Sequence, residues 1–555
     1  MPAPLLTALL ALSLATSAAS RQGAVATSHP LASEVGAAVL RDGGNAADAA
    51  VAAALALGVV EPFSSGIGGG GFALVYLARE RKVHVLDFRE VAPAAATASM
   101  FLVDGKPEPG RSRDGGLAVA VPGAVKGYAE LARRFGSRPL ARLTAPAERL
   151  AREGFRVGER YGQLARERRD CLAADAAARV ELLARDPAGG VAAPAPGALL
   201  VRRDLADTLH AIGESGGEAF YSGPLAERIA RAVRERGGVL TAADLAAFRV
   251  RERQPLEGTY RGHRVVSMPL PSAGGAILIA LLQALEAEAP RAGGYRPERF
   301  LHAMIEVEQR LFARRADALA DPAFAPGAEA AVRELVAPAY AARLRAAVKE
   351  RAAPGGGPAR EGHTHHLSVV DREGNAVALT TTVNLPFGSC VVVPGTGVLL
   401  NDEMDDFEAA AKAPNAYGLA GRGLNRPAPG KIPLSSMAPT LLLDRDRRLE
   451  LVVGSPGGST IPTTVAQVIS HVVDDQMPLD AALAAPRLHA QGAEGVWVEP
   501  DGLEAATARA LEARGHRLVV KERPWGNAQA VELDAASGLA RAASDPRGEG
   551  APAVP

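Results

Sequence analysis

The residue in this sequence best suited to chemistry is Thr364, which begins a strand-like segment. It follows the Pro/Gly-rich run AAPGGGPAR (352–360), which is flexible enough to be strained and cut. Cleavage of the His363–Thr364 bond would leave an α-amine beside the Thr364 hydroxyl. Such an amine has a pKa of about 7.7–8.0, close to the ideal for a general base at neutral pH. A threonine hydroxyl paired with its own α-amine is a recognised nucleophile, so Thr364 is a candidate N-terminal nucleophile. The ordinary alternative is a threonine that only favours β-structure.

A predicted hairpin gives Thr364 a partner. Two segments rich in Val, Leu and Thr flank the loop DREGN (371–375), whose Gly and Asn tolerate the positive φ of a short turn. Pairing Val370 with Ala376 would place Thr364 opposite Thr382, whose hydroxyl could orient the first or relay its proton. A slip of one residue would turn these side chains to the other face, so this role depends on the register. The expected strands are 365–370 and 376–382.

Long motifs spread over nearly the whole chain carry a resemblance to one family. Around the hairpin these are THHLSVVD, TTTVNLPFGS and GVLLNDEMDDF, followed by PLSSMAPT and GSPGGS. Nearer the amino terminus stand RDGGNAADAAVAAALALGVVEPFSSGIGGGGF and LDFREVAP, and PWGNAQAVE and SDPRGEGA follow near the other end. In this order they resemble the γ-glutamyltransferase family (γ-glutamyl transpeptidase, glutathione hydrolase), within the N-terminal-nucleophile hydrolase superfamily.

The resemblance implies an α+β fold, a four-layer αββα sandwich formed jointly by two autoproteolytic fragments. The large subunit would be residues 21–363 and the small catalytic subunit residues 364–555, paired as a heterodimer within one folded unit. The implied reaction is transfer of the γ-glutamyl group of glutathione or a related donor, through a Thr364 ester, to water or to an amino acid or dipeptide.

A γ-glutamyl group needs a pocket with both signs of charge, because it carries an α-carboxylate and an α-ammonium. The segment NDEMDDF supplies Glu403 and Asp406, and Asn384 supplies an amide. The resemblance places these three around the α-ammonium. It assigns the α-carboxylate to Arg89, Ser435 and Ser436, where a guanidinium fork suits a carboxylate. Two adjacent serines on a strand would diverge, so we expect a turn at 433–437.

Two further features follow from the resemblance. Gly457 and Gly458 match the oxyanion hole, where glycines let backbone N–H groups approach the developing charge. The segment 415–419 (NAYGL) resembles a lid loop, with Tyr417 as its gating residue next to Asn384. Related cephalosporin acylases lack this lid or alter the pocket, so the intact lid favours a γ-glutamyl enzyme over an acylase acting on glutaryl β-lactams.

The helices and strands that must position these residues can be predicted from the sequence around them. Alanine-rich helices are expected at 29–41 and 45–57, the second with Asn45 as its N-cap. The run GIGGGG (66–71) formally matches a dinucleotide-binding fingerprint. It follows a helix and precedes the strand FALVYLA, the reverse of the Rossmann order, so we expect close backbone approach there instead. A second strand is predicted at 83–88, with Arg89 at its end.

Two other patterns resemble functional motifs without their context. GESGG (213–217) matches a nucleophile elbow, but no strand leads into it, so we interpret it as a helix cap and turn. The basic cluster RERR (166–169) is interpreted as a solvated helix face.

His363, His365 and His366 flank the nucleophile and could suggest a metal site. Adjacent strand residues point to opposite faces, and no acidic or cysteine partner shares their spacing. We therefore expect no metal and no cofactor, and a packing or hydrogen-bonding role for one of these histidines.

Composition excludes some classes of protein. Sixty-two basic and sixty-two acidic residues cancel over 555 positions, without the basic patch of a nucleic-acid binder. Cys171 and Cys390 lie on opposite sides of the proposed cut. A disulfide between them is one alternative, and two separate buried thiols are the favoured one.

The amino terminus, MPAPLLTALLALSLATSAAS (1–20), is typical of a secretory signal peptide, although no Lys or Arg precedes its apolar core. A mis-assigned start or a membrane anchor is the alternative. The apolar core is short for a span, and no other run reaches about 18 apolar residues. We expect an exported, periplasmic or extracellular protein. A non-catalytic protein of the same fold is the third hypothesis, and the sequence leaves open the physiological donor, the acceptor and the oligomeric state.

Overall fold

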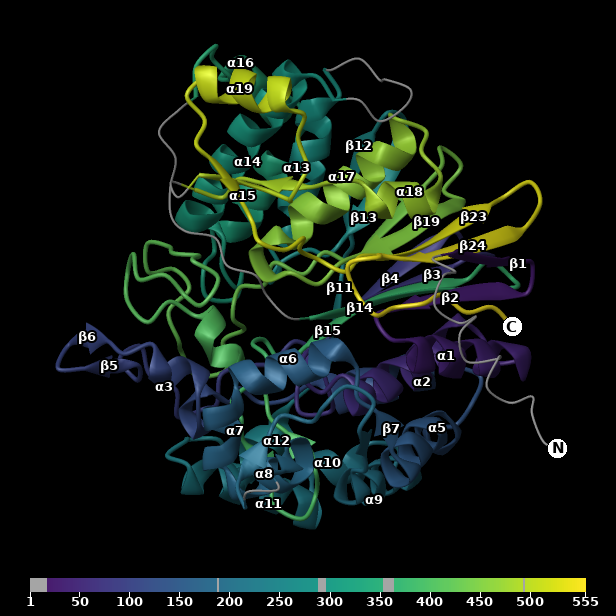
Figure 1. The fold of residues 1–555 in the computed structure, drawn as a ribbon, viewed down its shortest axis with the longest axis vertical. Helices are drawn as coiled ribbons and strands as arrows, with labels where there is room; N and C mark the ends of the chain where they lie inside the picture. The colour runs from purple at the N-terminus through teal and green to yellow at the C-terminus, as the bar shows by residue number, and fades with distance from the viewer. Residues whose placement is uncertain (1–16, 187–188, 288–295, 353–363, 493–494) are drawn as a thin grey trace.

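The computed structural model describes residues 17–186, 189–287, 296–352, 364–492 and 495–555. Two antiparallel β-sheets and the helices around them make an α+β fold (Figure 1). His363 and most of the Pro/Gly-rich run lie outside the described residues.

The hairpin predicted from the sequence lies inside a six-stranded sheet. Its strands, in spatial order, are β11 (Arg251–Arg253), β4 (Lys82–Asp87), β3 (Gly70–Leu77), β15 (Ala376–Thr382), β14 (His365–Asp371) and β2 (Gly23–Thr27). All neighbours are antiparallel. The hairpin therefore pairs on both sides with strands that precede the proposed cut.

A second sheet of seven strands packs against the first. Its order is β1 (Ser17–Ser20), β24 (Leu539–Ser544), β23 (Gln529–Asp534), β19 (Leu449–Gly454), β18 (Thr440–Leu443), β13 (His263–Ser267) and β12 (Leu256–Tyr260). Strand β14 contacts β19 and β23, and β15 contacts β19. Segments from both sides of the proposed cut thus contribute to both sheets.

Alternation along β14 distributes its side chains between two cores, as strand geometry requires. Leu367 and Val369 belong to one cluster with helix α2 (Ala46–Val60), whereas Val370 joins the cluster that contains Val452 of β19. Helix α2 is buried on nearly every side. Its alanines let it pack closely on β14 and β15.

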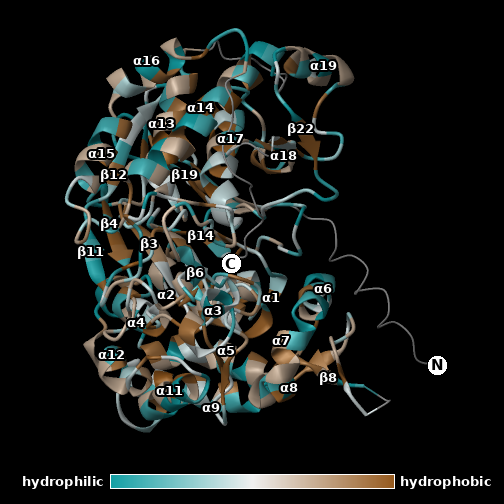
Figure 2. Ribbon diagram, turned by 90° about the vertical axis from the view of Figure 1, so that its left-hand side faces the viewer, coloured by the Kyte–Doolittle hydropathy of each residue, from teal (hydrophilic) through white to brown (hydrophobic). Residues whose placement is uncertain are grey.

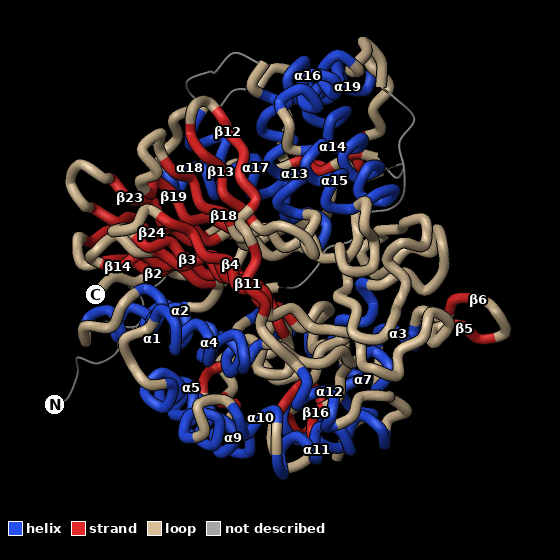
Figure 3. The backbone as a smooth tube through the Cα atoms, turned by 180° about the vertical axis from the view of Figure 1, so that it is seen from behind, coloured by secondary structure: helices blue, strands red, loops and turns tan. Residues whose placement is uncertain are grey.

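Other helices pack on the second sheet. Helix α13 (Gly274–Leu285) contacts β12 and β13, and α17 (Ile461–Val473) contacts α13 and β19. Figure 3 shows helices on both sides of the strands of the two sheets, with α13 and α14 on one side and α1, α2 and α4 on the other. The remaining longer helices are α1 (Pro30–Arg41), α4 (Ala124–Phe135), α5 (Leu140–Glu153), α9 (Arg203–Glu214), α11 (Gly223–Glu235) and α14 (Glu298–Ala318).

Shorter elements complete the chain. The helices are α3 (Gly110–Arg113), α6 (Glu159–Glu167), α7 (Arg169–Ala174), α8 (Ala176–Leu182), α10 (Glu218–Tyr221), α12 (Ala242–Ala247), α15 (Ala328–Leu335), α16 (Pro338–Ala346), α18 (Leu479–Ala484), α19 (Ala505–Ala513), η1 (Gly116–Ala118), η2 (Glu403–Asp406) and η3 (Gly458–Thr460). The strands are β5 (Leu102–Val103), β6 (Lys106–Pro107), β7 (Phe155–Arg156), β8 (Ala184–Arg185), β9 (Val191–Ala192), β10 (Leu199–Leu200), β16 (Val392–Val393), β17 (Val398–Leu399), β20 (Leu488–His489), β21 (Val496–Val498) and β22 (Leu518–Val520).

The expected early elements are confirmed with small shifts. The helix predicted at 29–41 is α1, and His29 is its N-cap, with the ring Nδ1 accepting from Leu31 N–H at 3.2 Å. Asn45 caps α2 as predicted, in a capping box with Asp48. Residues 17–20, expected at the end of a leader, form β1 against β24. No helix among the described residues is long and apolar enough to cross a membrane.

The interpretation of the cysteines as separate thiols is wrong. Cys171 and Cys390, 219 positions apart in sequence, form a disulfide with their Cα atoms 5.9 Å apart. Cys171 lies on α7, which directly follows α6. Figure 2 shows that α6 is largely hydrophilic. The bond therefore joins a residue before the proposed His363–Thr364 cleavage site to a residue after it.

Candidate active site

The predicted pairing of Thr364 with Thr382 has the geometry that the hairpin required. Val370 pairs with Ala376 in the β14–β15 ladder, so the predicted register is confirmed. The Thr364 hydroxyl donates to Thr382 Oγ1 at 3.4 Å, and Thr382 Oγ1 also accepts from the Asn384 N–H at 2.8 Å. Thr364 and Thr382 are 5% and 3% exposed, so the two hydroxyls meet almost out of water.

A small cavity lies beside Thr364. The residues around it are Arg89, Thr364, Thr382, Asn384, Glu403, Asp406, Tyr417, Ser435, Ser436, Met437, Gly458 and Ile461. Of the described residues predicted to take part in catalysis or donor binding, only Gly457 does not line this cavity, and it directly precedes Gly458. Segments more than 300 residues apart in sequence, from Arg89 to Ser436, therefore converge on one hydroxyl.

Charges of both signs are paired at one end of this cavity. Arg89 forms close ion pairs with Glu403 and Asp406, and all three are buried. Burial raises the pKa of Glu403 to about 7, the Asp406 carboxylate adds to this, and Arg89 opposes it. Burial likewise raises the pKa of Asp406 against the pull of Arg89. Burial, reinforced by Glu403, raises the pKa of Glu90 well above its usual range.

Two polar atoms of this cavity are left with unused hydrogen-bonding capacity. Glu403 Oε2 and Ser436 Oγ are buried and have no partner among the described residues. Ser435 Oγ, by contrast, accepts from Met437 N–H at 3.0 Å. Because buried polar atoms are nearly always satisfied, the free oxygens of Glu403 and Ser436 are suited to a polar ligand.

The turn expected at 433–437 is wrong. The segment is extended, and Ser435 forms an isolated bridge with Ser272. Both serines nevertheless line the cavity. The Ser435 N–H donates to Pro271 O and the Ala273 N–H donates to Ser435 O, both at 2.9 Å, so backbone pairing with the turn after β13 holds the segment.

Tyr417 closes the cavity from the predicted lid segment. Its hydroxyl donates to Asn384 O at 3.0 Å and to Asn384 Oδ1 at 2.5 Å. Asn384 Nδ2 donates to Asp402 O at 3.0 Å, and Asn415 Nδ2 donates to Asp406 Oδ1 at 3.1 Å. Tyr417 is 4% exposed, so its ring is buried beside the charged residues of the cavity.

Gly457 and Gly458 carry backbone conformations that favour glycine, with φ of +136° and +59°. A Cβ on Gly458 would lie 2.8 Å from the Tyr417 ring. Neither glycine N–H donates to another group among the described residues. The two N–H groups are therefore available to a negatively charged oxygen.

Comparison with known proteins decides the family. Residues 32–554 match the model of the family described as Gamma-glutamyltranspeptidase, which is nearly the whole chain. The chain belongs to the γ-glutamyltranspeptidase family.

Curated members of the γ-glutamyltranspeptidase family are similar over their full length. The glutathione hydrolase proenzyme of Escherichia coli (strain K12) is 37% identical over 541 residues, covering 95% of this chain and 91% of that protein. The glutathione hydrolase proenzyme of Pseudomonas aeruginosa is 38% identical, and the match covers 99% of this chain and 98% of that protein. The acylase ACY 1 proenzyme of Pseudomonas sp. (strain SE83) is 37% identical, covering 93% and 91%.

Solved structures give the same grouping. A cephalosporin acylase from Bacillus halodurans superimposes with a TM-score of 0.85 at 30% identity, covering 100% of this chain and 99% of that one. The γ-glutamyltranspeptidase of Helicobacter pylori superimposes with a TM-score of 0.55 at 37% identity, covering 58% and 90%.

This γ-glutamyltranspeptidase-family chain also surrounds Thr364 with a network that sequence reasoning missed. His365 Nδ1 lies 2.7 Å from Ser65 Oγ, and its Nε2 lies 2.7 Å from Glu61 Oε2. Burial alone would raise the pKa of Glu61, but His365 and His29 bring it below its usual range. Burial lowers the pKa of His29. Nothing in the local spacing links Glu61 to position 365.

His366 points to the other face of β14, as predicted for adjacent strand residues. Its ring nitrogens lie 2.8 Å from Thr380 Oγ1 and 3.1 Å from Ser368 Oγ. Burial lowers its pKa to about 3, which keeps the ring neutral at neutral pH. Both described histidines of the cluster thus have hydrogen-bonding roles.

The glycine run 66–71 makes the close backbone approach predicted for it. A Cβ on Gly68 would lie 2.0 Å from Leu399 O, and a Cβ on Gly69 would lie 2.0 Å from Thr382 O. Any larger residue at Gly69 would displace the strand that carries Thr382. The run therefore packs directly against the backbone of Thr382.

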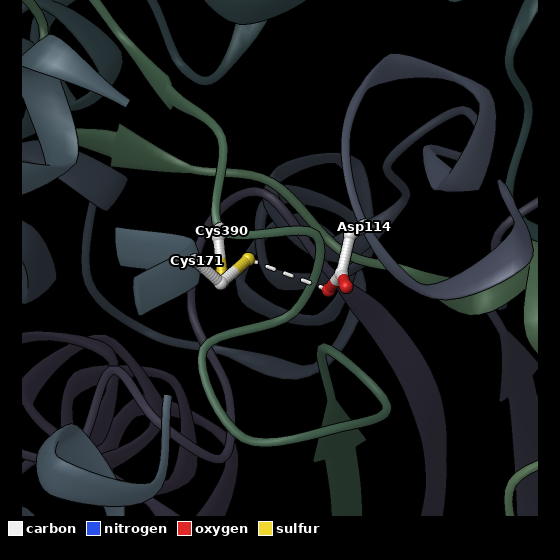
Figure 4. A group of neighbouring side chains, drawn as sticks. All are labelled: Asp114, Cys171 and Cys390. Atoms are coloured by element: carbon white, nitrogen blue, oxygen red, sulfur yellow. Dashed lines mark hydrogen bonds between the residues drawn. A yellow bond between two sulfur atoms is a disulfide. The ribbon is translucent and has the colours of Figure 1, made fainter. Parts of the chain in front are cut away.

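Two groups of described residues have the spacing of a metal site, and neither lines the Thr364 cavity. One is His302, Glu306 and His516; the other is Asp114, Cys171 and Cys390, drawn in Figure 4. In the second group the sulfurs are joined as a disulfide, so they offer no thiolate to a metal.

The two motifs set aside in the sequence have different outcomes. The GESGG segment ends α9, with Gly216 and Gly217 at positive φ, so the predicted cap and turn are confirmed. The interpretation of RERR as a solvated face is wrong for Arg168. Its side chain is 18% exposed and donates to the carbonyl oxygens of Pro386 and Gly388, both at 3.1 Å.

Proposed function

We propose that this chain is a self-processing γ-glutamyl transferase/hydrolase that uses Thr364 as an N-terminal nucleophile. The observation that carries the proposal is the position of the Thr364 hydroxyl. It lies between Thr382 and a small cavity whose buried charges have both signs. A γ-glutamyl group is a short, unbranched ligand with an ammonium and a carboxylate at the end remote from the reacting carbonyl.

Maturation is proposed as an N→O acyl shift. Thr364 Oγ adds to the carbonyl carbon of His363, and the peptide nitrogen leaves as the Thr364 amine. Water then hydrolyses the ester, which gives His363 a carboxylate and frees the hydroxyl. The products are residues 21–363 and residues 364–555, after loss of a leader at 1–20.

Catalysis would reuse the same hydroxyl. The free α-amine takes the hydroxyl proton as Oγ attacks the γ-carbonyl of the donor. The N–H groups of Gly457 and Gly458 would stabilise the oxyanion, where one donor is worth about 2.7–4 kcal/mol. The leaving amine departs with the proton, and Thr382 would orient Oγ. Water or an amine acceptor then resolves the ester.

Donor binding would use the polar groups of the cavity. Glu403, Asp406 and Asn384 are assigned to the α-ammonium, and Glu403 Oε2 lacks a partner among the described residues. Arg89, Ser435 and Ser436 are assigned to the α-carboxylate, and Ser436 Oγ is likewise free among the described residues. Tyr417 would close over the bound group.

The fine architecture belongs to the same proposal. A four-layer αββα sandwich, shared by the two fragments, is supported by contacts of α2 with β14 and β15, of the sheets with each other, and of α13 with β12. Export, periplasmic or extracellular, rests on the leader-like residues 1–20. The donor is glutathione or a related compound, and amino acids or dipeptides are the acceptors besides water. No metal or cofactor takes part.

An acylase acting on a glutaryl amide is the second candidate. It is favoured by the close superposition on a cephalosporin acylase, with a TM-score of 0.85. A glutaryl group lacks the α-ammonium and would leave the Glu403 carboxylate unmatched. The buried Arg89–Glu403–Asp406 group therefore favours the γ-glutamyl donor.

The deciding experiment is a denaturing gel beside a γ-glutamyl anilide assay, run with and without Gly-Gly. Two fragments and γ-glutamyl activity are expected, with Gly-Gly measuring transfer against hydrolysis. Activity on a glutaryl amide alone would establish the acylase. An uncut, inactive chain would establish a non-catalytic protein.

A further inference from the structure

The Cys171–Cys390 disulfide joins two segments that the proposed processing would separate. Cys171 belongs to residues 21–363 and Cys390 to residues 364–555, so the bond would survive cleavage as a covalent link between fragments. Cys390 is 2% exposed and Cys171 is half-buried, so a thiol reagent can approach from the Cys171 side.

Cys390 ends a strained segment that begins at the substrate residue Asn384. Three non-glycine residues of this segment have positive φ: Asn384 (+79°), Phe387 (+59°) and Cys390 (+60°). Such conformations are unfavourable for residues other than glycine and persist only where their surroundings enforce them. The segment 384–390 therefore needs external support to keep its shape.

Arg168 provides part of that support. Its Nε donates to Pro386 O at 3.1 Å, and its Nη2 donates to Gly388 O and Cys390 Sγ, both at 3.1 Å. Asp114 accepts from the same Nη2 at 2.6 Å, and Asp114 Oδ1 lies 3.4 Å from Cys171 Sγ, as Figure 4 shows. Thus one guanidinium bridges two carbonyls of the segment and the disulfide itself.

The supported segment carries a group with a direct role in donor binding. Asn384 lies six residues before Cys390, and its side chain and carbonyl both accept from Tyr417. Phe387 is held in an aromatic cluster, with ring centroids 5.4 Å from Tyr161 and 6.1 Å from Phe63. The disulfide and Arg168 constrain the remaining end of this segment.

We propose that the Cys171–Cys390 disulfide and Arg168 form a clamp that joins the two fragments covalently and positions Asn384 for donor binding. These are positioning residues, since none of them lines the Thr364 cavity. The inference rests on the proposed function for the cut and for the donor. The bond itself can be tested without either.

The covalent link is tested on denaturing gels. Without reductant, the processed protein should run as one band at the mass of both fragments. Dithiothreitol should convert this band into two, because its two thiols become a cyclic disulfide as the protein bond gains two electrons and two protons. Two bands without reductant, under alkylation to block exchange, would overturn the link.

The uncut Thr364→Ala variant separates failure of the link from failure of processing. Peptide mapping of this variant without reduction should yield a linked peptide containing Cys171 and Cys390. Two alkylated cysteines there would refute the disulfide whatever the state of cleavage. A linked peptide in a wild-type chain that stays uncut would refute only the proposed processing.

Positioning is tested by separating KM from kcat. The Cys171→Ala/Cys390→Ala variant should raise KM for a γ-glutamyl donor about 3- to 10-fold and leave kcat within about twofold, because ground-state binding is weakened. Wild-type protein reduced with dithiothreitol should show the same rise in KM with little change in kcat. This measurement keeps the test valid if the double variant folds poorly. An unchanged KM in both would overturn the positioning role.

Arg168 has a matched control in its neighbour Arg169, which is exposed and pairs with Asp170. Arg168→Ala should raise KM like loss of the disulfide, and Arg168→Lys should restore part of the effect through one retained donor. Arg169→Ala should leave both constants unchanged. Equal effects of the two alanine variants would mean that charge alone is responsible.

Discussion

The Thr364 hydroxyl donates to Thr382 Oγ1 at 3.4 Å across the β14–β15 hairpin. This pairing brings together the hydroxyl of the proposed nucleophile and a hydroxyl at the end of β15, an inner strand of the six-stranded sheet. Because residues 376–382 of β15 all pair with β3, the position of Thr382 is fixed by the sheet, and Thr382 can orient the Thr364 hydroxyl.

Removal of the nucleophile should abolish both processing and activity. Thr364→Ala should give a single full-length chain on a denaturing gel and no γ-glutamyl anilide hydrolysis, because the same hydroxyl serves both reactions. Thr364→Ser keeps the hydroxyl and is the matched control, in which cutting should persist. Two fragments from the alanine variant would place the cut elsewhere.

Loss of the cationic group should weaken donor binding. Arg89→Ala removes charged hydrogen bonds worth about 1.5–3 kcal/mol, so kcat/KM should fall roughly 10- to 100-fold. Fragment formation should persist, because the Arg89 guanidinium donates to Pro433 O, Glu403 and Asp406 and not to Thr364. Arg89→Lys should retain part of the affinity. An uncut Arg89→Ala chain would mean that Arg89 is structural.

The ionisation of Glu403 should control the pH dependence of binding. Its pKa is raised by burial to about 7, so its carboxylate forms only as the pH rises through that value. Inhibition by free glutamate should therefore tighten between about pH 6 and 8. Glu403→Gln should weaken inhibition and flatten this dependence. A slope unchanged by the substitution would assign the titration to another group, such as the Thr364 amine.

The same shift predicts the sign of a stability change. From about pH 4.5 to 7 the folded chain holds a proton on Glu403 that the unfolded chain has released. Its contribution to the free energy of unfolding should therefore be present below pH 4.5 and decline as the pH rises to about 7. Denaturant unfolding of the wild type and of Glu403→Gln at both pH values measures this contribution. A free energy of unfolding that rises with pH in the wild type relative to the variant would contradict the prediction.

The lid contact should affect KM more than kcat. Tyr417→Phe removes the hydrogen bonds to Asn384 and keeps the ring against Gly458. A hydrogen bond contributes about 0.5–1.5 kcal/mol, so donor KM should rise about 2- to 10-fold. Tyr340→Phe, at a partly exposed ring on α16, is the control and should change nothing. A large loss of kcat alone would give Tyr417 a role in the chemical step.

Local pattern was sufficient for the hairpin, because alternation and turn chemistry act over neighbouring residues. Val370 pairs with Ala376 and Asn45 caps α2 as the sequence alone predicts. The conformation of segment 433–437 could not be predicted in this way. Its shape depends on backbone pairing with Ser272, which lies more than 150 residues earlier.

Thr364 could be proposed from its place after the Pro/Gly-rich run, whereas the charged residues and the lid were proposed from the resemblance of long motifs to one family. Their convergence on one cavity, the disulfide between Cys171 and Cys390, and the grip of Arg168 on Gly388 depend on the packing of distant segments. Spacing in sequence carries no distance between residues 219 positions apart. Only the folding of both sheets and their helices brings such atoms within reach of one another.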